Sequence, residues 1–455
     1  MGASVPSEAD AEGGSGRATR SFINAVRSAL APVTSVLRRL EIDTRMLGMI
    51  AALAIIWISF NVLSGGTFLT ARNLWNLSVQ SASIAIMATG MVLIIVSRNI
   101  DLSVGSMLGF LGYTMAMFQA VWIPQSLGLG LEQPYTWVAT VLIGIALGFA
   151  VGGLQGFVVA YGGVPSFIVT LGGLLIWRGL IFRYAQGQTL APLDTTFQML
   201  GGGTVGTRVG ALGEWPSWAL GVLMCLAIVY AMITSRRRKL RYGFPVRPVW
   251  AEVLVGAVAS GIVLGTVWVA NSYPLPPLVA VQYAQEHGIP VPPGGLFIPT
   301  GIAFPVVIML IVTLVVTFLA TRRRFGRYVY AIGGNPDAAV LAGINVRRTI
   351  MLTFALMGSL AAVSAAIQTA RLNAAVTSLG VQNELDVISA AVIGGTSFSG
   401  GIGTVPGAIL GAVVMQSLRS GMVLLLVDSP TQDIVVGIVL VAAVGLDAVF
   451  RRRVS

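Results

Sequence analysis

Residues 321–348, TRRRFGRYVYAIGGNPDAAVLAGINVRR, form a polar and basic segment between two long apolar runs. The arginines at both of its ends make the segment too charged to lie within lipid. Short basic loops of membrane proteins face the cytoplasm, so the segment is expected on that side. We therefore take 321–349 as a cytoplasmic loop that follows one membrane span and precedes another.

The middle of this loop has the pattern of a short capped helix. GGNP at 333–336 predicts a turn and then a helix start, with Asn335 as the cap and Pro336 at the first helical position. Asp337 would be favourable near the positive end of that helix, which would cover DAAVLAGI and stop at Gly343. Spacing alone leaves two interpretations open: a capped surface helix in an ordinary loop, or a helix on which a separate motor protein pushes.

The composition is that of a polytopic membrane protein. Of 455 residues, 55% are hydrophobic and only 10% are charged, whereas about 25% of residues are charged in soluble domains. The formal charge of +11 is carried by short clusters beside apolar runs, so we assign it to membrane topology and expect no nucleic-acid partner. The single cysteine, Cys225, and the single histidine, His287, allow neither an intrachain disulfide nor a histidine cluster for a metal.

The chain lacks the residues that would bind a nucleoside triphosphate. Its only lysine is Lys239, and no GxxxxGK[ST] sequence occurs. The glycine-rich GGTSFSGGIG at 394–403 also lacks that lysine, which favours a tight re-entrant turn over a phosphate loop. No arrangement of side chains for covalent catalysis is evident. We therefore expect no enzyme and no cofactor on this chain; if ATP powers it, another subunit binds the ATP.

Twelve apolar runs are candidates for membrane spans, because a span needs about 20 apolar residues. They are 46–63, 78–97, 103–122, 137–160, 165–185, 217–234, 249–270, 301–320, 350–370, 383–397, 404–427 and 431–450. The tenth is short and contains Glu384 and Asp386 beside several glycines, which favours a broken or re-entrant segment. The predicted fold is an all-α polytopic membrane protein with 10–12 transmembrane helices.

The basic clusters predict the orientation of the chain. They all face the cytoplasm if six spans precede Ser235 and the total is even, which places both termini inside. The predicted parts are an N-terminal tail at 1–45, a transmembrane domain at 46–450 and a basic C-terminus at 451–455. Within the tail, 21–40 has apolar residues on one helical face, and it is read either as an interfacial helix on anionic lipid or as a partly ordered linker.

Two runs of glycine predict where helices approach closely. Glycines recur every four residues at 144, 148, 152 and 156, and again at 403, 407 and 411. Each set lines one stripe of a helix, which lets a neighbouring backbone come near. We assign both stripes to helix packing, and such stripes also suit helices that slide.

Two acids interrupt apolar sequence in similar tripeptides, Ile100-Asp101-Leu102 and Leu385-Asp386-Val387. A charge at mid-membrane costs about 2.5–3.5 kcal/mol on insertion scales, so each acid needs a partner or a wet cavity. If the two halves form an inverted repeat, Asp101 would lie toward the inside and Asp386 toward the outside. For Asp101 we favour a structural role, either pairing with Arg98 or capping a helix that starts at Leu102.

Four segments resemble one known family. GRYVYAIGGNPDAAVLAGI at 326–344 is similar to the cytoplasmic coupling loop of sugar-importing ABC transporter permeases, the group that carries ribose, xylose, arabinose and galactose. NIDLSVGS at 99–106, VPSFIVTLG at 164–172 and RLNAAVTSLGVQNELDVISAAVIGGTSFSGG at 371–401 agree. With the SRRRK cluster at 235–239, the resemblance covers residues 45–453 and is strongest to the xylose-carrying members.

The resemblance implies an ATP-driven importer of the bacterial inner membrane. Its parts would be a permease dimer, ATPase subunits that bind ATP and Mg²⁺, and an external substrate-binding protein that delivers a monosaccharide. The loop would sit in a groove of the ATPase, with 335–337 setting the helix start and small alanines on the contact face. The implied coupling residues are Arg327, Gly333, Gly334, Asn335, Pro336, Asp337, Ala338, Ala339, Ala342 and Gly343. The tail at 1–45 and the region 242–300 exceed a minimal ten-span member.

Polar residues near the two acids could face a translocation path. Sugars need alternating hydrogen-bond donors and acceptors, which carboxylates, amides and hydroxyls supply. The candidates are Asn99, Asp101, Ser103, Ser106, Asn373, Glu384, Asp386, Thr396 and Ser397.

Two other functions stay open at this stage. A branched-chain amino acid permease of the same superfamily would use the same coupling loop, although IDLSVGS and RLN favour sugar. An ion-coupled carrier acting alone would use Asp101, Glu384 and Asp386 as ion sites. Dependence on an ATPase would discriminate the two classes.

Overall fold

The structure is a computed structural model that describes residues 44–128, 130, 133–293 and 295–452. The N-terminal tail at 1–43, with its proposed interfacial helix, and the last residues 453–455 lie outside the described residues. The chain divides into two compact units, one with residues 1–47 and 221–264 and one with residues 48–220 and 265–455, so the first four described residues of α2 fall in the first unit. We call the described parts of these the hairpin unit and the core unit, and each is treated by itself.

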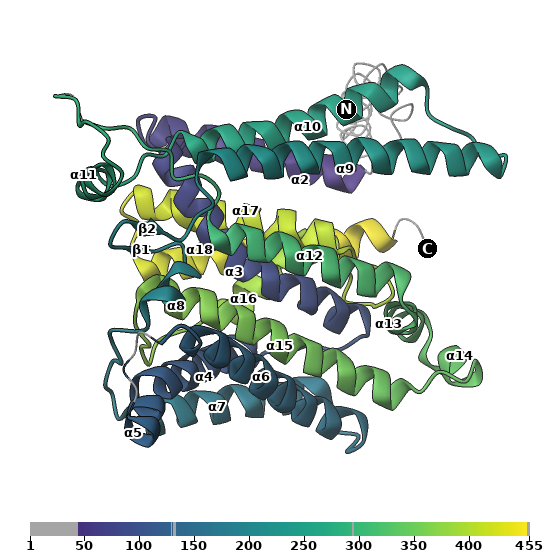
Figure 1. The fold of residues 1–455 in the computed structure, drawn as a ribbon. Helices are drawn as coiled ribbons and strands as arrows, with labels where there is room; N and C mark the ends of the chain where they lie inside the picture. Colours follow the sequence, from purple (N-terminus) through teal and green to yellow (C-terminus); the bar gives the residue numbers. More distant parts are fainter. Residues whose placement is uncertain (1–43, 129, 131–132, 294, 453–455) are drawn as a thin grey trace, which may run out of the picture. The chain divides into compact units, whose positions relative to one another are not determined.

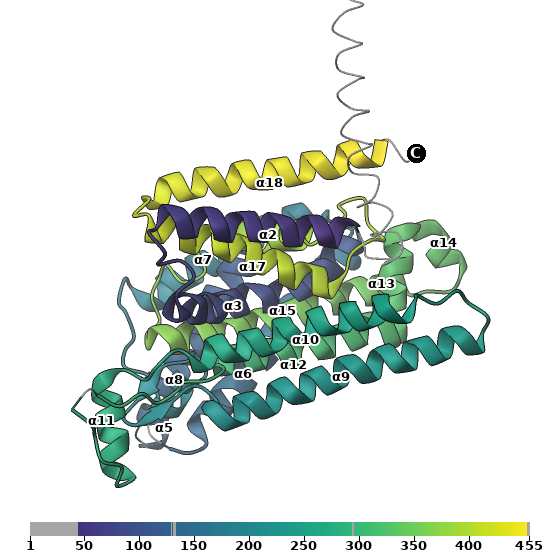
Figure 2. The same ribbon diagram turned by 90° about the horizontal axis from the view of Figure 1, so that it is seen from above.

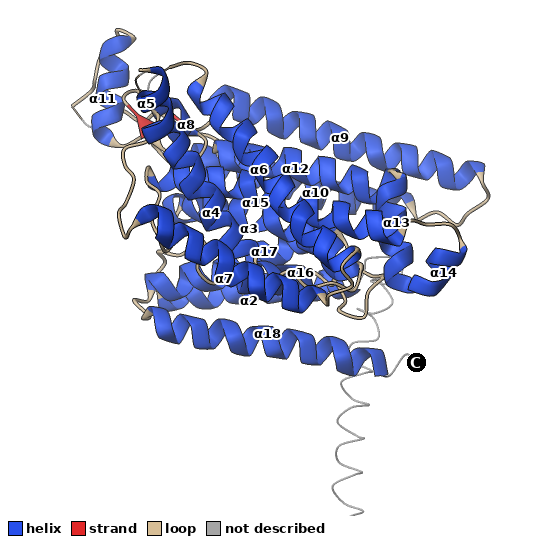
Figure 3. Ribbon diagram, turned by 90° about the horizontal axis from the view of Figure 1, so that it is seen from below, coloured by secondary structure: helices blue, strands red, loops and turns tan. Residues whose placement is uncertain are grey.

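Long helices make up most of the core unit (Figure 1). They are α2 (Thr44–Leu63), α3 (Ala71–Val96), α4 (Val104–Met117), α6 (Thr136–Ala160), α7 (Ser166–Ala185), α12 (Phe304–Arg322), α15 (Val346–Leu372), α17 (Val405–Leu424) and α18 (Ser429–Arg452). The shorter elements are η2 (Phe118–Trp122), α5 (Ile123–Leu127), α8 (Thr195–Met199), α11 (Pro277–Glu286), α13 (Arg324–Gly334), α14 (Pro336–Leu341) and α16 (Asn383–Ile393). The β1 (Thr204–Val205) and β2 (Arg208–Val209) strands form one antiparallel pair, the only strands drawn in Figure 3.

The predicted fold class is confirmed. Among the described residues, ten helices are long and apolar enough to cross a membrane, judged by length and composition. The α16 helix has 11 residues, which is about 16 Å at 1.5 Å per residue and far less than the roughly 30 Å hydrocarbon core. The prediction of a short, broken segment there is confirmed.

The α3 helix is the centre of the core unit. Every residue from Ser81 to Ser97 is buried, and α3 packs against α12, α15, α16 and α17. A helix that is apolar on all sides has this position because each of its faces needs a neighbour. Figure 2 shows α3 beneath α17 and α2.

The predicted glycine stripe of α6 packs on α15. A Cβ atom at Gly148 would overlap the carbonyl oxygen of Gly358, and one at Gly152 would overlap that of Phe354. Only glycine allows this approach of two helix backbones, so the assignment of these glycines to helix packing is confirmed.

The two ends of the core unit carry different short elements. Figure 1 and Figure 2 show α5, α8 and α11 at one end and α13 with α14 at the opposite end, and Figure 1 shows the β1–β2 pair at the first of these ends. The loop predicted at 321–349 therefore forms a compact structure at one end of the long helices.

One local prediction for this loop was wrong. Gly333 and Gly334 do not form a turn, because they are the last residues of α13. The sequence RFGRYVYAIGG places Gly326, Val329, Ile332 and Gly333 on one buried helical face, and that periodicity extends the helix to the glycines. The rest of the prediction is confirmed: Asn335 Oδ1 accepts the Ala338 N–H at 3.1 Å, Pro336 begins α14, and Gly343 follows its end with φ +77°.

The hairpin unit consists of the greater part of α9 (Glu214–Arg241) and α10 (Val249–Asn271). The two helices are joined by residues 242–248. Arg236 and Glu252 form an ion pair at 2.7 Å near this connection, and Cys225 Sγ lies 3.8 Å from the Ser260 carbonyl oxygen further along. Within the region 242–300, the α10 helix accounts for residues 249–271, and both helices of the hairpin are among the ten span candidates of the described residues.

Candidate translocation and coupling sites

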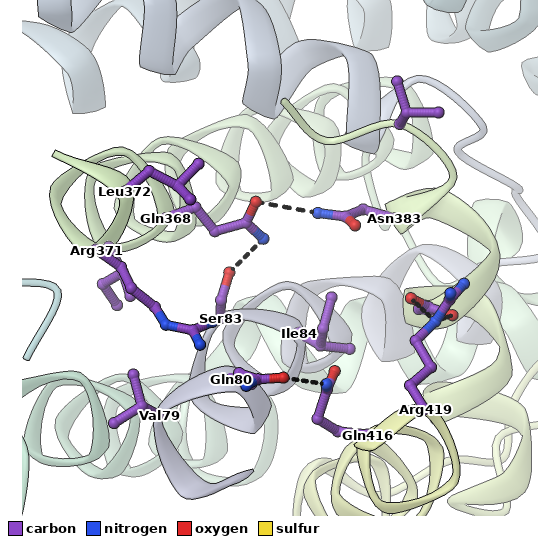
Figure 4. Close-up of a pocket in the computed structure, with 13 residues that line it drawn as sticks. Val79, Gln80, Ser83, Ile84, Gln368, Arg371, Leu372, Asn383, Gln416 and Arg419 are labelled. Carbon is purple, nitrogen blue, oxygen red and sulfur yellow. Dashed lines mark hydrogen bonds and ion pairs between the residues drawn. The ribbon is translucent and has the colours of Figure 1, made fainter. Parts of the chain in front are cut away.

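A polar cavity of about 270 Å³ lies among α3, α15, α16 and α17 in the core unit (Figure 4). Eight of its thirteen lining residues are polar or charged, an unusual share for a space between apolar helices. The polar ones are Gln80, Ser83, Gln368, Arg371, Asn383, Asp386, Gln416 and Arg419. Polar side chains between spans are costly and therefore mark a path or binding site.

Four carboxamides line the cavity, and they bond to one another in two groups. Gln416 Nε2 donates to Gln80 Oε1 at 2.8 Å. Gln368 Nε2 donates to Ser83 Oγ at 2.8 Å, while its Oε1 accepts from Asn383 Nδ2 at 3.3 Å. An amide has two N–H donors and an oxygen with two lone pairs, so these contacts leave donors and acceptors for a solute.

Charged groups occupy two sides of the cavity. Arg419 Nε lies 2.8 Å from Asp386 Oδ2, and Arg419 Nη1 lies 3.6 Å from Asp433 Oδ1. Within the described part of the chain, Arg371 has no carboxylate partner, so its guanidinium is available at the cavity. Figure 4 shows Arg371 and Arg419 on opposite sides of the space.

The helices explain how the sequence brings these groups together. Each contributing helix is mainly apolar and carries its polar residues on the side that faces the cavity: Gln80 and Ser83 on α3, Gln368 and Arg371 on α15, Gln416 and Arg419 on α17. Residues three apart lie on one helical face. Because α16 is short, Asn383 near its start also reaches the cavity.

Of the nine residues predicted for the path, Asp386 alone lines this cavity. The other eight lie elsewhere, and several are held in local hydrogen bonds. Asn99 donates to the Ser97 carbonyl at 2.9 Å, Asn373 Oδ1 accepts the Leu193 N–H at 2.9 Å, and Ser397 contacts Ser399 at 3.0 Å. The buried Ser106 and Thr396 and the partly buried Glu384 are likewise outside the lining.

Asp101 is buried in the connection between α3 and α4, without the partner expected for it. Its Oδ1 accepts from the Ser103 N–H at 2.8 Å and from Ser103 Oγ at 2.6 Å. The side chain of Arg98 contacts the Gly333 carbonyl instead, so the predicted pair of Asp101 with Arg98 is wrong. The α4 helix begins at Val104, two residues after the predicted start at Leu102. Burial raises the pKa of Asp101, and the Ser103 hydrogen bonds oppose that rise in part.

The loop at 321–349, the candidate for coupling, is fastened to α3 by Arg98. Arg98 Nε donates to the Gly333 carbonyl at 2.7 Å and Nη2 donates to that of Gly334 at 2.9 Å. Arg98 itself has φ +63°, and Gly401 donates its N–H to the Val96 carbonyl at 2.9 Å. The end of α13, the end of α3 and the 394–403 turn therefore meet at one junction.

The exposed surface of α14 differs from the predicted contact face. Asp337, Ala338 and Ala342 are exposed as expected, but Ala339 and Gly333 are buried within the chain and cannot form part of such a face. Its largest exposed groups are Val340 and Leu341, with 59% and 89% of their surface accessible. These two adjacent aliphatic side chains are the main apolar surface that α14 exposes.

Residues 73–444 match the family described as the permease component of the branched-chain amino acid transport system. The chain belongs to this permease family. It is 37% identical to the xylose transport system permease protein XylH of Escherichia coli over 91% of this chain and 94% of the relative. It is 36% identical to XylH of Haemophilus influenzae over 89% and 96% of the two chains, and 31% identical to the ribose import permease protein RbsC of Escherichia coli over 84% and 87%.

No solved structure matches the permease. Its relatives identify a transport permease, and the ten apolar helices identify a multi-pass membrane protein.

Most of the cavity residues of this permease were missed by the sequence reasoning. They are Gln80, Ser83, Gln368, Arg371, Asn383, Gln416 and Arg419. A signal for them was present, because glutamine and arginine inside runs such as SAAIQTARL and VVMQSLRS are as unusual as the acids that drew attention. The sequence does not show which helices pack against one another, and it is this packing that brings four such runs together.

Proposed function

We propose that this permease is the membrane-spanning subunit of an ATP-driven importer for a monosaccharide, with D-xylose as the first candidate. The observation that supports this most is the cavity lined by four carboxamides and two arginines. The names of the two XylH relatives support xylose, and that of RbsC supports a neutral sugar more generally.

The cavity suits a small neutral solute. Its volume of about 270 Å³ is near the lower limit of roughly 300 Å³ for small-molecule sites. A branched-chain amino acid would place its aliphatic side chain in a cavity where eight of thirteen lining residues are polar, and Asp386, the acid in that lining, is already paired with Arg419. Each amide can donate to one hydroxyl and accept from another, which is the pattern that a sugar presents.

The exposed α14 supports coupling to a separate ATPase. Val340 and Leu341 would enter a groove of that subunit, and the ATP and Mg²⁺ would be bound there, because this chain has no P-loop. A substrate-binding protein would deliver the sugar from the outside, and a second copy of the permease would complete the path. The permease would lie in a bacterial inner membrane with both termini in the cytoplasm, consistent with its basic ends.

Radiolabelled D-xylose uptake into proteoliposomes tests the proposal. The vesicles would contain the permease, a candidate ATPase and a candidate binding protein, and each would be omitted in turn. We expect uptake to require ATP and all three proteins, and to be lost on Asp337→Arg, which places a cation at the positive end of α14. Gln368→Leu should lower uptake and leave the amount of bound ATPase unchanged.

The same vesicles test the ion-coupled alternative. Uptake by the permease alone, driven by a proton or sodium gradient and indifferent to Asp337, would contradict the proposal. If the complete system takes up leucine and no xylose, the proposed coupling through the loop would still hold, and the proposal of a sugar substrate would be wrong.

A further inference from the structure

The hairpin unit contains an apolar groove of about 590 Å³ between α9 and α10. On α9 the lining residues follow one helical stripe, Val229, Met232, Ile233, Arg236, Arg237 and Leu240. On α10 they are Glu252, Val253, Gly256, Ala257 and Ser260, which also share a face. The facing stripes are apolar over most of their length and charged only near the connection between the helices.

The charged end of the groove carries an excess of positive charge. Residues 235–247, SRRRKLRYGFPVR, contain six cations and no acid. Arg236 is held by Glu252 at 2.7 Å and donates to the Arg247 carbonyl at 3.0 Å. Arg237, which also lines the groove, is exposed, and the described residues offer it no carboxylate.

Aromatic residues surround the same end. Tyr242, Phe244 and Trp250 have 67%, 63% and 50% of their surface accessible. Tyrosine and tryptophan concentrate at the level of lipid headgroups, and basic residues beside them attract anionic lipid. This end of the hairpin therefore has the composition of a membrane interface.

The length of the groove fits one half of a bilayer. From Val229 to Arg237 is eight residues, or about 12 Å along a helix, and one leaflet contributes about half of the 30 Å hydrocarbon core. An acyl chain lying along Val229, Met232 and Gly256 would place its headgroup beside Arg237.

We propose that the groove between α9 and α10 binds one anionic phospholipid, with the acyl chain along the apolar stripe and the phosphate at Arg237. The occupant is a lipid because the groove combines an apolar wall with an unpaired cation at its interfacial end. The site gives the SRRRK cluster a specific ligand in addition to its general effect on topology, and it is independent of the transported solute.

The test is native mass spectrometry of the full-length permease in detergent with equal amounts of dioleoyl-phosphatidylglycerol and dioleoyl-phosphatidylcholine. We expect a preferentially retained phosphatidylglycerol. Arg237→Gln should reduce its retention by about fivefold, as expected for one cation near an anionic headgroup. Arg238→Gln is the matched control, because it removes the same charge from the neighbouring residue, which does not line the groove.

A second pair of variants tests the apolar wall. Gly256 lines the groove and its Cβ would lie 3.1 Å from Met232 Sδ, so Gly256→Leu fills the space; Gly261→Leu is the control, since a Cβ there has nothing within 4 Å. We expect loss of phosphatidylglycerol only in Gly256→Leu.

Three results would overturn the proposal. Equal losses from Arg237→Gln and Arg238→Gln would mean a diffuse electrostatic attraction without a site. Equal retention of both lipids would leave the groove to a second copy of the chain or to another of its segments. If added glycerol phosphate displaces the bound phosphatidylglycerol as effectively as added lipid does, the site binds an anion and does not bind an acyl chain.

Discussion

Substitution of Gly333 by alanine tests the junction that holds the coupling loop. A Cβ there would overlap the Val96 carbonyl oxygen and lie 2.5 Å from the Gly401 nitrogen, and these two atoms form a 2.9 Å hydrogen bond with each other. All of the obstructing atoms are backbone, so they cannot move aside as a side-chain end can. The end of α13 must therefore separate from α3.

The magnitude follows from three contributions. Overpacking costs about 1–3 kcal/mol, loss of the Gly401 to Val96 hydrogen bond costs about 1 kcal/mol, and alanine in a helix returns about 0.5–1 kcal/mol. The net destabilisation of the docked loop is about 1–3 kcal/mol, which corresponds to roughly 5- to 150-fold in the docking equilibrium.

Hydrogen exchange measures that equilibrium directly. In Gly333→Ala, amides of a peptide covering 394–403 should exchange faster by the factor above, and ATP-driven uptake should fall with them. The matched control is Gly334→Ala, because a Cβ at this neighbouring helical glycine has nothing within 4 Å. Unchanged exchange and uptake in Gly333→Ala would refute the claim that the junction is closely packed and needed for coupling.

Four further predictions concern separate parts of the permease. Leu341→Asp should reduce co-purification of the ATPase at least about tenfold, as for a contact hot spot. Leu426→Asp is the control, because Leu426 is also highly exposed, at 92%, and this substitution should leave co-purification unchanged. Gln368→Leu removes both amide contacts of that side chain and should weaken binding of the proposed sugar by about 5- to 10-fold. The measurement is the concentration of sugar that gives half-maximal uptake. The melting temperature should change by no more than a few degrees. Arg98→Lys loses the two hydrogen bonds from the guanidinium to the Gly333 and Gly334 carbonyls. Because Arg98 is exposed, this substitution should destabilise the loop by only about 1 kcal/mol. The measurement is faster hydrogen exchange at 324–334. Because burial raises the pKa of Asp101 above 3.8, the folded state binds more protons than the unfolded state, so this acid should make the melting temperature fall as pH rises from about 3.8 to the raised pKa. Asp101→Asn should make that slope shallower.

The sequence could predict the helices and the coupling loop because their signals are local. The twelve apolar runs all became helices, and Asn335 caps α14 as its spacing required. The α13 helix was missed because its helical pattern of buried positions lies among arginines that suggested a loop. The charge pattern was used to predict the side of the membrane, and it carried no information about helix formation.

The candidate cavity could not be predicted in the same way. Asp386 was identified because an acid among apolar residues is conspicuous, yet its partner Arg419 lies 33 residues away on another helix. Gln80 and Gln416 are separated by 336 positions, and only the packing of α3 on α17 brings them within 2.8 Å. Asp101 drew the same attention, but it is buried against Ser103, which is only two positions away in sequence. A single sequence shows that a buried polar residue needs a partner, but it does not show which residue that partner is.

The close contact between α6 and α15 determines what α15 can do when its end is displaced. The α15 helix is separated from α14 by four residues, extends over 27 residues and carries Gln368 and Arg371 near its far end. It is therefore about 40 Å long. At Gly148, Gly152 and Gly358 the two backbones lie against each other with no side chain between them to absorb bending. We therefore expect the pair to move as a stiff unit, so that a tilt imposed at the α14 end of α15 displaces the wall of the cavity.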